Sequence, residues 1–206
     1  MKKIVCIVAL CALSLAHAYA QKPFRVGVTG GMNVSKPADE DEFKTNVGFN
    51  VGVVGEFRLS EKEKTSIYLS TSLLLSSKGT KSSDDSDDDY YRYTINAYSV
   101  ELPVHFDFKG HINRDLSILI GTGPYFGYGL FGNIKVKNDY GSGSLGTFKS
   151  EGALKRFDFG WSSRAGIELY KCYQILAGYD GGFLNLSRIG GTYRNSCFSF
   201  SVACMF

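Results

Sequence analysis

The sequence lacks three features that would define common classes of protein. After the first twenty residues, no apolar run is long enough to cross a membrane as a helix. Cysteine is rare: Cys6 and Cys11 lie within those twenty residues, and the three that remain are too few for a disulfide framework. A strong basic excess is also absent. Without Lys2 and Lys3 the chain carries 23 − 2 = 21 basic against 20 acidic residues, which argues against a nucleic-acid binder.

The first twenty residues have the composition of a secretory signal peptide. Met1–Lys3 is basic, Ile4–Leu15 is apolar, and Ala18 and Ala20 form an A-x-A cleavage site before Gln21. An uncleaved anchor is the alternative, but this apolar run is too short to span a bilayer as a stable helix. We therefore predict a signal peptide over 1–20 and a single domain over 21–206.

Glycine is abundant in this domain, and apolar side chains recur at every second position. Ile67–Ser76 and Val100–Phe108 are clear examples, and a helix cannot keep this pattern on one face. The stretch Tyr173–Ser187 alternates less regularly, and its Gly181-Gly182 pair suggests a bulge or kink. We count eight strands, which begin near Val26, Phe49, Ile67, Val100, Ile118, Phe157, Tyr173 and Phe198.

The connections between these strands alternate in length. The predicted odd connections are longer, at Ser35–Thr45, Gly79–Arg92, Asn133–Lys155 and Arg188–Tyr193. The even ones are shorter, at Ser60–Thr65, Lys109–Arg114 and Lys171-Cys172. In an antiparallel meander all odd connections lie at one end. Long loops at one end and tight turns at the other are typical of an outer-membrane barrel.

Alternation alone does not show whether the apolar face meets lipid or a buried core. A soluble barrel such as a lipocalin turns its apolar face inward. Here the other face carries glycine, serine and a few charges, which suit a narrow interior. Aromatic residues gather near both ends of the strands, as at two membrane interfaces. The predicted fold is all-β: a closed eight-stranded antiparallel transmembrane β-barrel with up-and-down meander topology.

The last strand ends on an aromatic residue, Phe206, after alternating apolar positions. In a closed barrel this strand pairs with the first, which places Phe206 at the turn-end interface. Such an ending resembles the C-terminal signal by which bacterial barrels are recognised for assembly. The sequence therefore predicts the barrel assembly machinery as a partner and Phe206 as the assembly signal.

The charges on the non-lipid face predict a structural network inside the barrel, because unpaired charges in a narrow interior are costly. The predicted members are Glu101, Arg164 and Glu168, with Glu56, Arg58 and Arg25 as further candidates.

Three segments indicate a family. Ser70–Gly79, Tyr98–His105 and Gly121–Tyr125 together resemble the PorT-like outer-membrane beta-barrel domain family of Bacteroidota. The resemblance spans nearly the whole mature chain. It implies an eight-stranded barrel in a Gram-negative outer membrane and does not imply one function.

Two patterns invite a chemical interpretation. His105 shares a strand face with Glu101, Asp107 and Ser99, but no G-x-S-x-G motif occurs, and inward carboxylates more often pair with arginines. The acidic runs Asp39–Glu42 and Asp84–Asp89 suggest divalent cations. However, Tyr90 replaces the glycine of a calcium loop, so we interpret both runs as solvated charge. No metal, cofactor or catalytic residue is predicted.

We therefore predict a non-enzymatic outer-membrane barrel with a filled interior and long extracellular loops. Its role would be structural, adhesin-like or that of an assembly partner. A lipid-modifying outer-membrane enzyme is the alternative, and a diffusion pore is disfavoured because eight strands leave an interior just filled by side chains. The predicted surroundings are outer-membrane lipids and lipopolysaccharide, with an unknown membrane-protein partner and no nucleic acid.

Overall fold

The computed structural model describes residues 23–37, 43–86, 89–138, 141–148, 154–188 and 192–206. At the outermost strand tips it describes the backbone alone. The predicted signal peptide over 1–20 and the acidic run Asp39–Glu42 lie outside the described residues.

Ten strands make up the fold. They are β1 (Phe24–Pro37), β2 (Phe43–Lys44), β3 (Asn46–Lys62), β4 (Thr65–Ser86), β5 (Asp89–His111), β6 (Leu116–Asn138), β7 (Gly141–Gly146), β8 (Phe157–Leu169), β9 (Tyr173–Gly182) and β10 (Asn195–Met205). No helix among the described residues is long and apolar enough to span a membrane.

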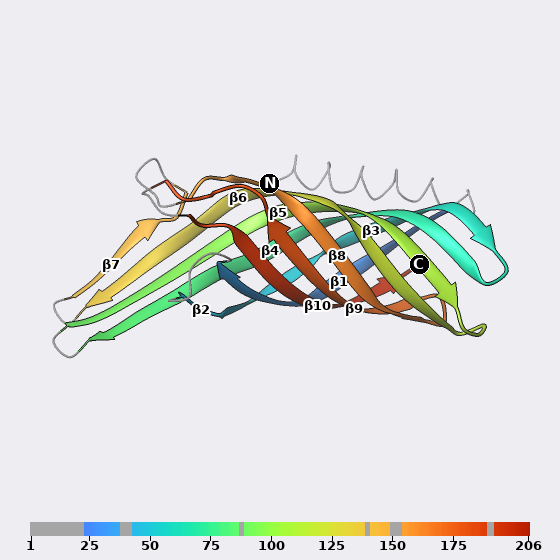
Figure 1. Cartoon of the computed structure of the whole chain (residues 1–206), viewed down its shortest axis with the longest axis horizontal. Coiled ribbons are helices and arrows are strands. Elements are labelled where there is room, and N and C mark those ends of the chain that lie inside the picture. Colours follow the sequence, from blue (N-terminus) through green and yellow to red (C-terminus); the bar gives the residue numbers. More distant parts are fainter. Residues whose placement is uncertain (1–22, 38–42, 87–88, 139–140, 149–153, 189–191) are drawn as a thin grey trace, which may run out of the picture.

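Eight of these strands form a closed antiparallel ring (Figure 1). The ring order is β1-β3-β4-β5-β6-β8-β9-β10, and the short strands β2 and β7 pair outside it with β4 and β6. β1 and β10 close the ring over a register that runs from Gly27↔Met205 to Pro37↔Asn195. The predicted eight-stranded antiparallel barrel is confirmed.

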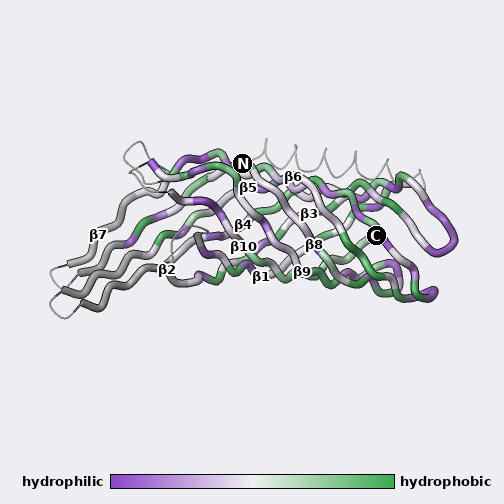
Figure 2. Tube along the Cα trace, in the orientation of Figure 1, coloured by the Kyte–Doolittle hydropathy of each residue, from purple (hydrophilic) through white to green (hydrophobic). Residues whose placement is uncertain are grey.

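The apolar face of the strands points outward. On β3, Phe49, Val51 and Val53 are 43–50% exposed, whereas Asn50 and Glu56 of the same strand are buried. Buried residues throughout the ring are mostly polar or charged, which is the reverse of a soluble barrel. Figure 2 shows apolar positions recurring along the barrel strands and hydrophilic residues gathered in the turns. The outward apolar face of the strands therefore contacts lipid.

Two predicted loops are instead strands. Most of Gly79–Arg92 belongs to β4 and β5, which stay paired as far as Ser86↔Asp89. Within Asn133–Lys155, β6 continues to Asn138 and pairs with β7. These polar stretches form ladders because the two arms of a hairpin satisfy each other's backbone without needing apolar side chains. The seventh ring strand, β9, ends at Gly182 and not at Ser187, so the last connection is 183–194.

Three neighbouring strands are far longer than a membrane crossing requires. β4 has 22 residues and β5 and β6 have 23 each, whereas about 9–11 residues cross a bilayer. Pairing between β6 and β8 stops at Tyr128↔Phe157, so residues 129–138 of β6 continue past the end of β8. The outer ends of β4, β5 and β6 and the short strand β7 form one sheet that continues past the barrel (Figure 1). We call this sheet the extension. Residues 129–138 of β6 alone span roughly 30 Å along the strand, at about 3.3 Å per residue.

The connection between β8 and β9 is a tight turn. Tyr170 and Lys171 both have positive φ, 53° and 56°, and the N–H of Cys172 donates to the carbonyl of Leu169 at 3.0 Å. This is the geometry of a type I′ hairpin turn, whose twist matches that of the flanking strands. Neither central residue is glycine or asparagine, so the left-handed backbone carries some strain here.

Candidate functional site

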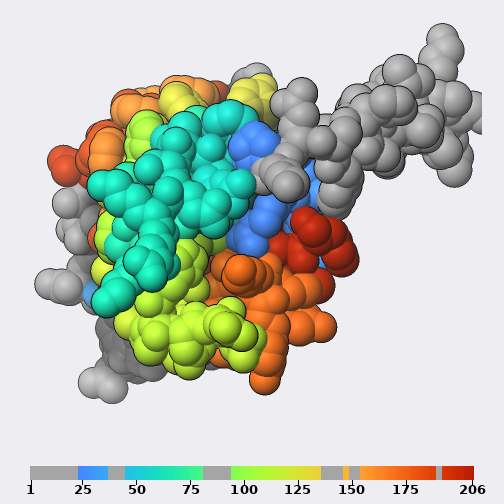
Figure 3. Space-filling model, turned by 90° about the vertical axis from the view of Figure 1, so that its right-hand side faces the viewer, coloured from blue at the N-terminus to red at the C-terminus, as the bar shows by residue number. Residues whose placement is uncertain are grey.

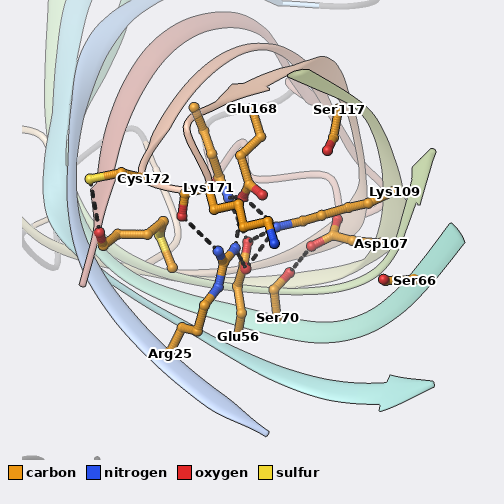
Figure 4. Close-up of polar contacts among 12 residues, drawn as sticks. Arg25, Glu56, Ser66, Ser70, Asp107, Lys109, Ser117, Glu168, Lys171 and Cys172 are labelled. Atoms are coloured by element: carbon orange, nitrogen blue, oxygen red, sulfur yellow. Dashed lines mark hydrogen bonds and ion pairs between the residues drawn. The ribbon is translucent and has the colours of Figure 1, made fainter. Parts of the chain in front are cut away.

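The interior of the barrel is filled by ion pairs, of which the largest group lies at the turn end (Figure 4). Arg25 contacts both Glu56 and Glu168, at 2.5 and 2.7 Å. Lys109 contacts the same two carboxylates at 2.8 and 2.6 Å. The amide of Gln174 donates to both acids at 2.8 Å. We call these five residues the turn-end cluster. Two cations balance two anions, and every member except Arg25 is buried.

Five different strands supply this cluster: β1, β3, β5, β8 and β9. The aromatic side chain of Tyr68 on β4 also contacts the cluster, because the Lys109 ammonium lies 4.4 Å from the centroid of its ring. One structural unit therefore cross-links six of the eight ring strands from within. The structure brings together Arg25, Glu56 and Glu168 of the predicted network.

Lys109 and Gln174 were not among the predicted members of the network. The sequence analysis placed Lys109 at the start of a turn, but β5 continues to His111. Its side chain shares the alternation of Glu101, His105 and Asp107, all of which point inward. This two-residue period could have identified it.

A second ion pair lies one layer further into the barrel. The guanidinium of Arg164 donates to both oxygens of Asp107, at 3.2 and 2.6 Å, and to the hydroxyl of Ser70 at 2.7 Å. Asp107 is fully buried. The predicted partners of Arg164 were Glu101 and Glu168, and the structure instead gives it Asp107, which the sequence analysis had placed near His105.

A third group lies nearer the extension. Lys78 of β4 pairs with Glu101 at 2.8 Å and with Asp180 at 3.2 Å. Ser99 also donates to Glu101, at 3.0 Å. Glu101 therefore belongs to a different layer from Glu168. The predicted network is three stacked groups along the barrel axis, not one connected set.

Arg58 lies at the rim and not inside the barrel. It pairs with Glu61, three residues further along β3, and both side chains are partly exposed. These two residues line a vestibule of about 730 Å³ at the turn end, together with charged residues of the β3–β4 and β5–β6 turns. The vestibule reaches inward as far as Arg25 and Glu168.

His105 contacts a serine in a geometry unsuited to nucleophilic catalysis. Its Nε2 lies 2.9 Å from the hydroxyl of Ser162, and that hydroxyl donates its proton to Asp180 at 2.7 Å. Because a hydroxyl has one proton, His105 donates to Ser162 here and does not accept from it, which is the reverse of a general base. Its other ring nitrogen has no hydrogen-bond partner in the described part of the chain.

The spaces between the layers are small. A cavity of about 70 Å³ is lined by His105, Arg164, Asp180 and neighbouring polar residues. A second cavity, of about 50 Å³, lies beside Lys78 and Glu101. Each has room for a few water molecules and none for a lipid chain.

Residues of two connections cover the barrel end next to the extension. Phe148, Leu154 and Leu186 form a buried apolar cluster, and Tyr193 packs against it. The Lys155 N–H donates to the Leu186 carbonyl and joins the two connections, and the Leu154 N–H donates to Thr147 within the first of them. We call these covering residues the cap. Burial, with a smaller effect of the Asp158 carboxylate, raises the pKa of the Tyr193 hydroxyl to about 12.

Within the described ranges, no three His, Cys, Asp or Glu side chains are placed to hold a metal ion. Of the second acidic run, Asp84–Ser86 and Asp89 lie in β4 and β5, and their side chains are outside the described residues.

A closed ring with an apolar exterior and a charged, filled interior defines the class: a small transmembrane β-barrel. The chain belongs to the family described as the outer membrane protein beta-barrel domain, which matches residues 19–188. It is an outer-membrane barrel protein.

Solved structures similar to this chain include proteins of Yersinia pestis, Neisseria and Pseudomonas aeruginosa. Ail, the attachment invasion locus protein of Yersinia pestis, in complex with the heparin analogue sucrose octasulfate, is 17% identical, with 89% of this chain and 99% of that chain covered and a TM-score of 0.41. Neisserial surface protein A is 9% identical, covering 90% and 98%, with a TM-score of 0.44. OprG of Pseudomonas aeruginosa is 9% identical, covering 89% and 94%, with a TM-score of 0.43. No curated protein matches significantly.

The pairing of Arg164 with Asp107 gives a first testable prediction. Arg164→Ala should lower the free energy of unfolding by about 3–5 kcal/mol, because it leaves the buried Asp107 carboxylate without its cation. The measurement is urea unfolding of the barrel refolded in lipid vesicles. Adding Asp107→Asn to Arg164→Ala should recover part of the loss.

Arg58→Ala is the matched control. Its ion pair with Glu61 is partly exposed, and such pairs contribute about 0–1 kcal/mol. Equal losses for Arg58→Ala and Arg164→Ala would contradict the division of the predicted network into a rim residue and a buried one.

Proposed function

We propose that this protein is a sealed, non-enzymatic barrel that holds the extension outside the cell as an adhesin-like binding surface. The observation that carries this proposal is the extension itself, in which β4, β5 and β6 continue well past the end of the barrel and are joined by β7. The membrane-spanning ring needs none of these extra residues.

The filled interior supports a role in display over one in transport. Three layers of paired charge cross the lumen, and the two cavities between them have volumes of about 70 and 50 Å³. Larger barrels that conduct leave an aqueous channel. The cap covers the same end from which the extension rises.

The outer edge of the extension supports a binding role. In the described part of the chain, β7 pairs with β6 alone, so its other edge offers backbone donors and acceptors. An exposed sheet edge is a surface to which a partner strand can add by backbone hydrogen bonding. At the other side of the extension, the part of β4 beyond its pairing with β3 is paired, among the described residues, with the two residues of β2.

The arrangement around His105 supports the non-enzymatic proposal against a lipid-modifying enzyme. His105 and Ser162 are buried inside the barrel, next to a cavity too small for a lipid substrate. The Ser162 proton is directed to Asp180 and not to His105.

The proposed surroundings of the apolar face are outer-membrane lipids and lipopolysaccharide. We also propose that this protein is a PorT-like barrel of a Bacteroidota species, because Ser70–Gly79, Tyr98–His105 and Gly121–Tyr125 resemble that family.

The orientation can be tested with an epitope tag. A tag inserted after Ser86, at the tip of the β4–β5 hairpin, should bind antibody on intact cells, because long connections of outer-membrane barrels face outward. The matched control carries the tag after Glu63, in the turn between β3 and β4, and should bind antibody only after the outer membrane is permeabilised. The opposite accessibility of the two tags would refute the orientation.

The binding role can be tested by shortening the extension without opening the barrel. Replacing residues 83–92 with Asn-Gly closes the β4–β5 hairpin at the existing pair Ser82↔Tyr93. Replacing residues 136–143 in the same way closes β6–β7 at Lys135↔Ser144. The full-length barrel in nanodiscs should bind at least one probe on an array of extracellular-matrix proteins and cell-surface glycans, and the doubly shortened barrel should lose that binding.

Heat-modifiable migration on gels checks that the shortened barrel is still folded. Equal retention of the two folded barrels on every probe would contradict an adhesin-like extension.

Phe206 gives a prediction about the proposed assembly partner. Its side chain is 62% exposed and its N–H donates to the Val26 carbonyl at 2.7 Å, so it lies at the turn-end interface. A charge at this depth costs only about 0–1 kcal/mol. Phe206→Asp should nevertheless reduce the amount of folded barrel in the outer membrane several-fold, because it removes the terminal aromatic that we propose is recognised.

The matched control is Phe57→Asp. Phe57 is also an exposed aromatic near the turn end, but it lies within the chain and not at its last position. Membrane fractionation and heat-modifiable migration report both variants. Similar folded levels for Phe206→Asp and Phe57→Asp would eliminate the recognition role.

A further inference from the structure

Two cysteines far apart in sequence lie side by side at the turn end of the barrel. Cys172 follows the β8–β9 turn, and Cys204 is near the end of β10. Their sulfur atoms are 3.7 Å apart. Figure 3 looks onto this end and shows the orange β8–β9 turn beside the red C-terminal residues.

The backbone holds both residues in place. Tyr173 and Cys204 are register partners, and the N–H of Met205 donates to the Cys172 carbonyl at 2.7 Å. From inside the barrel, Arg25 donates to the carbonyl of Lys171 at 2.8 Å, which ties the turn to the turn-end cluster (Figure 4). The two sulfurs would have to move from 3.7 Å to about 2.05 Å to form a bond, and we expect side-chain rotation to supply this movement while the strand pairing stays intact.

Both thiols are accessible, whereas the third cysteine is not. Cys172 and Cys204 are each partly exposed, and Cys172 Sγ contacts only the Met205 carbonyl besides its neighbour sulfur among the interactions described. Cys197 is fully buried and pairs in register with Asp180, toward the opposite end of the barrel. An oxidant in water at the turn end reaches the pair and not Cys197.

We propose that Cys172 and Cys204 form a disulfide bond in the folded barrel. In the proposed orientation these residues face the periplasm, an oxidising compartment in which disulfides form and persist. The oxidant is an exchangeable protein disulfide. One thiolate of the pair attacks it, forming a mixed disulfide and releasing one thiol of the oxidant. The second barrel thiolate then attacks the barrel's own sulfur in the mixed disulfide and releases the oxidant's second thiol, so that the barrel loses two electrons and two protons and the oxidant becomes a dithiol.

The bond would join the strand that closes the barrel to the turn held by Arg25. It joins positions that are 204 − 172 = 32 residues apart in sequence, and the closed loop contains all of β9 and most of β10. Separation of β10 from β9 would then require either breaking a covalent bond or displacing the β8–β9 turn. The disulfide thus fastens the closing strand β10 to β9, next to the seam between β1 and β10.

Peptide mapping tests the proposal directly. Barrel purified from outer membranes is alkylated while denatured, without reductant, and digested with trypsin, which cuts after Lys171, Arg188 and Arg194. The expected product is peptide 172–188 linked to peptide 195–206, lighter by two hydrogens than their sum, which reductant separates. Because peptide 195–206 also contains Cys197, the Cys197→Ser barrel is the matched control and should give the same linked pair.

A second readout is the temperature at which the folded gel band is lost. Reductant should lower this temperature for the wild type and for Cys197→Ser, and should leave Cys172→Ser and Cys204→Ser unchanged. Alkylated, unlinked Cys172 and Cys204 in the barrel from cells would overturn the proposal, as would a link to Cys197 or between two chains. A linked pair together with a failed tag experiment would overturn the orientation and leave the disulfide standing.

Discussion

Lipid offers no hydrogen bonds to a polypeptide backbone, and the rest of this structure depends on that constraint. Each strand must find a partner on both sides, so β1 and β10 pair along eleven register positions, from Gly27↔Met205 to Pro37↔Asn195. Closure with eight strands makes a narrow lumen. Unpaired charge in a narrow lumen is costly, so most of the charged residues inside pair with one of opposite sign, and the buried Asp158 instead accepts hydrogen bonds from Tyr125 and Asn195.

Several ion pairs in the lumen connect strands that are not neighbours in the ring, such as Lys109 of β5 with Glu56 of β3 and Glu168 of β8. The turn-end cluster draws from β1, β3, β5, β8 and β9, which lie around the whole circumference. In a soluble protein such links would pass through an apolar core. Here the apolar surface faces lipid and the polar groups form the core, so hydrogen-bonded charge takes the place of side-chain packing in specifying one arrangement.

The ring of strands could be predicted from the sequence because apolar side chains recur with a period of two, so that every second side chain faces the lumen. Phe49, Val51 and Val53 alternate with small or polar residues, and lipid contact requires that pattern. The extension could not, because the composition of Ser82–Asp89 resembles that of a solvated loop. The partner of Arg164 was also missed: alternation places a side chain in the lumen but does not give its height, and only the stagger between β5 and β8 brings Asp107 level with Arg164.

The long β4–β5 hairpin also has a consequence for the order of folding. Its first pair, Ser86↔Asp89, closes a very short loop, and hairpins form in roughly 1–10 μs. The pair Gly27↔Met205 joins residues 205 − 27 = 178 positions apart, and contacts of such separation are the slowest to form. We expect the ladder to grow from this hairpin toward both chain ends. Until the ends meet, β1 and β10 each present an unpaired edge that other chains can join, so the interval before closure is when the protein is most prone to aggregate.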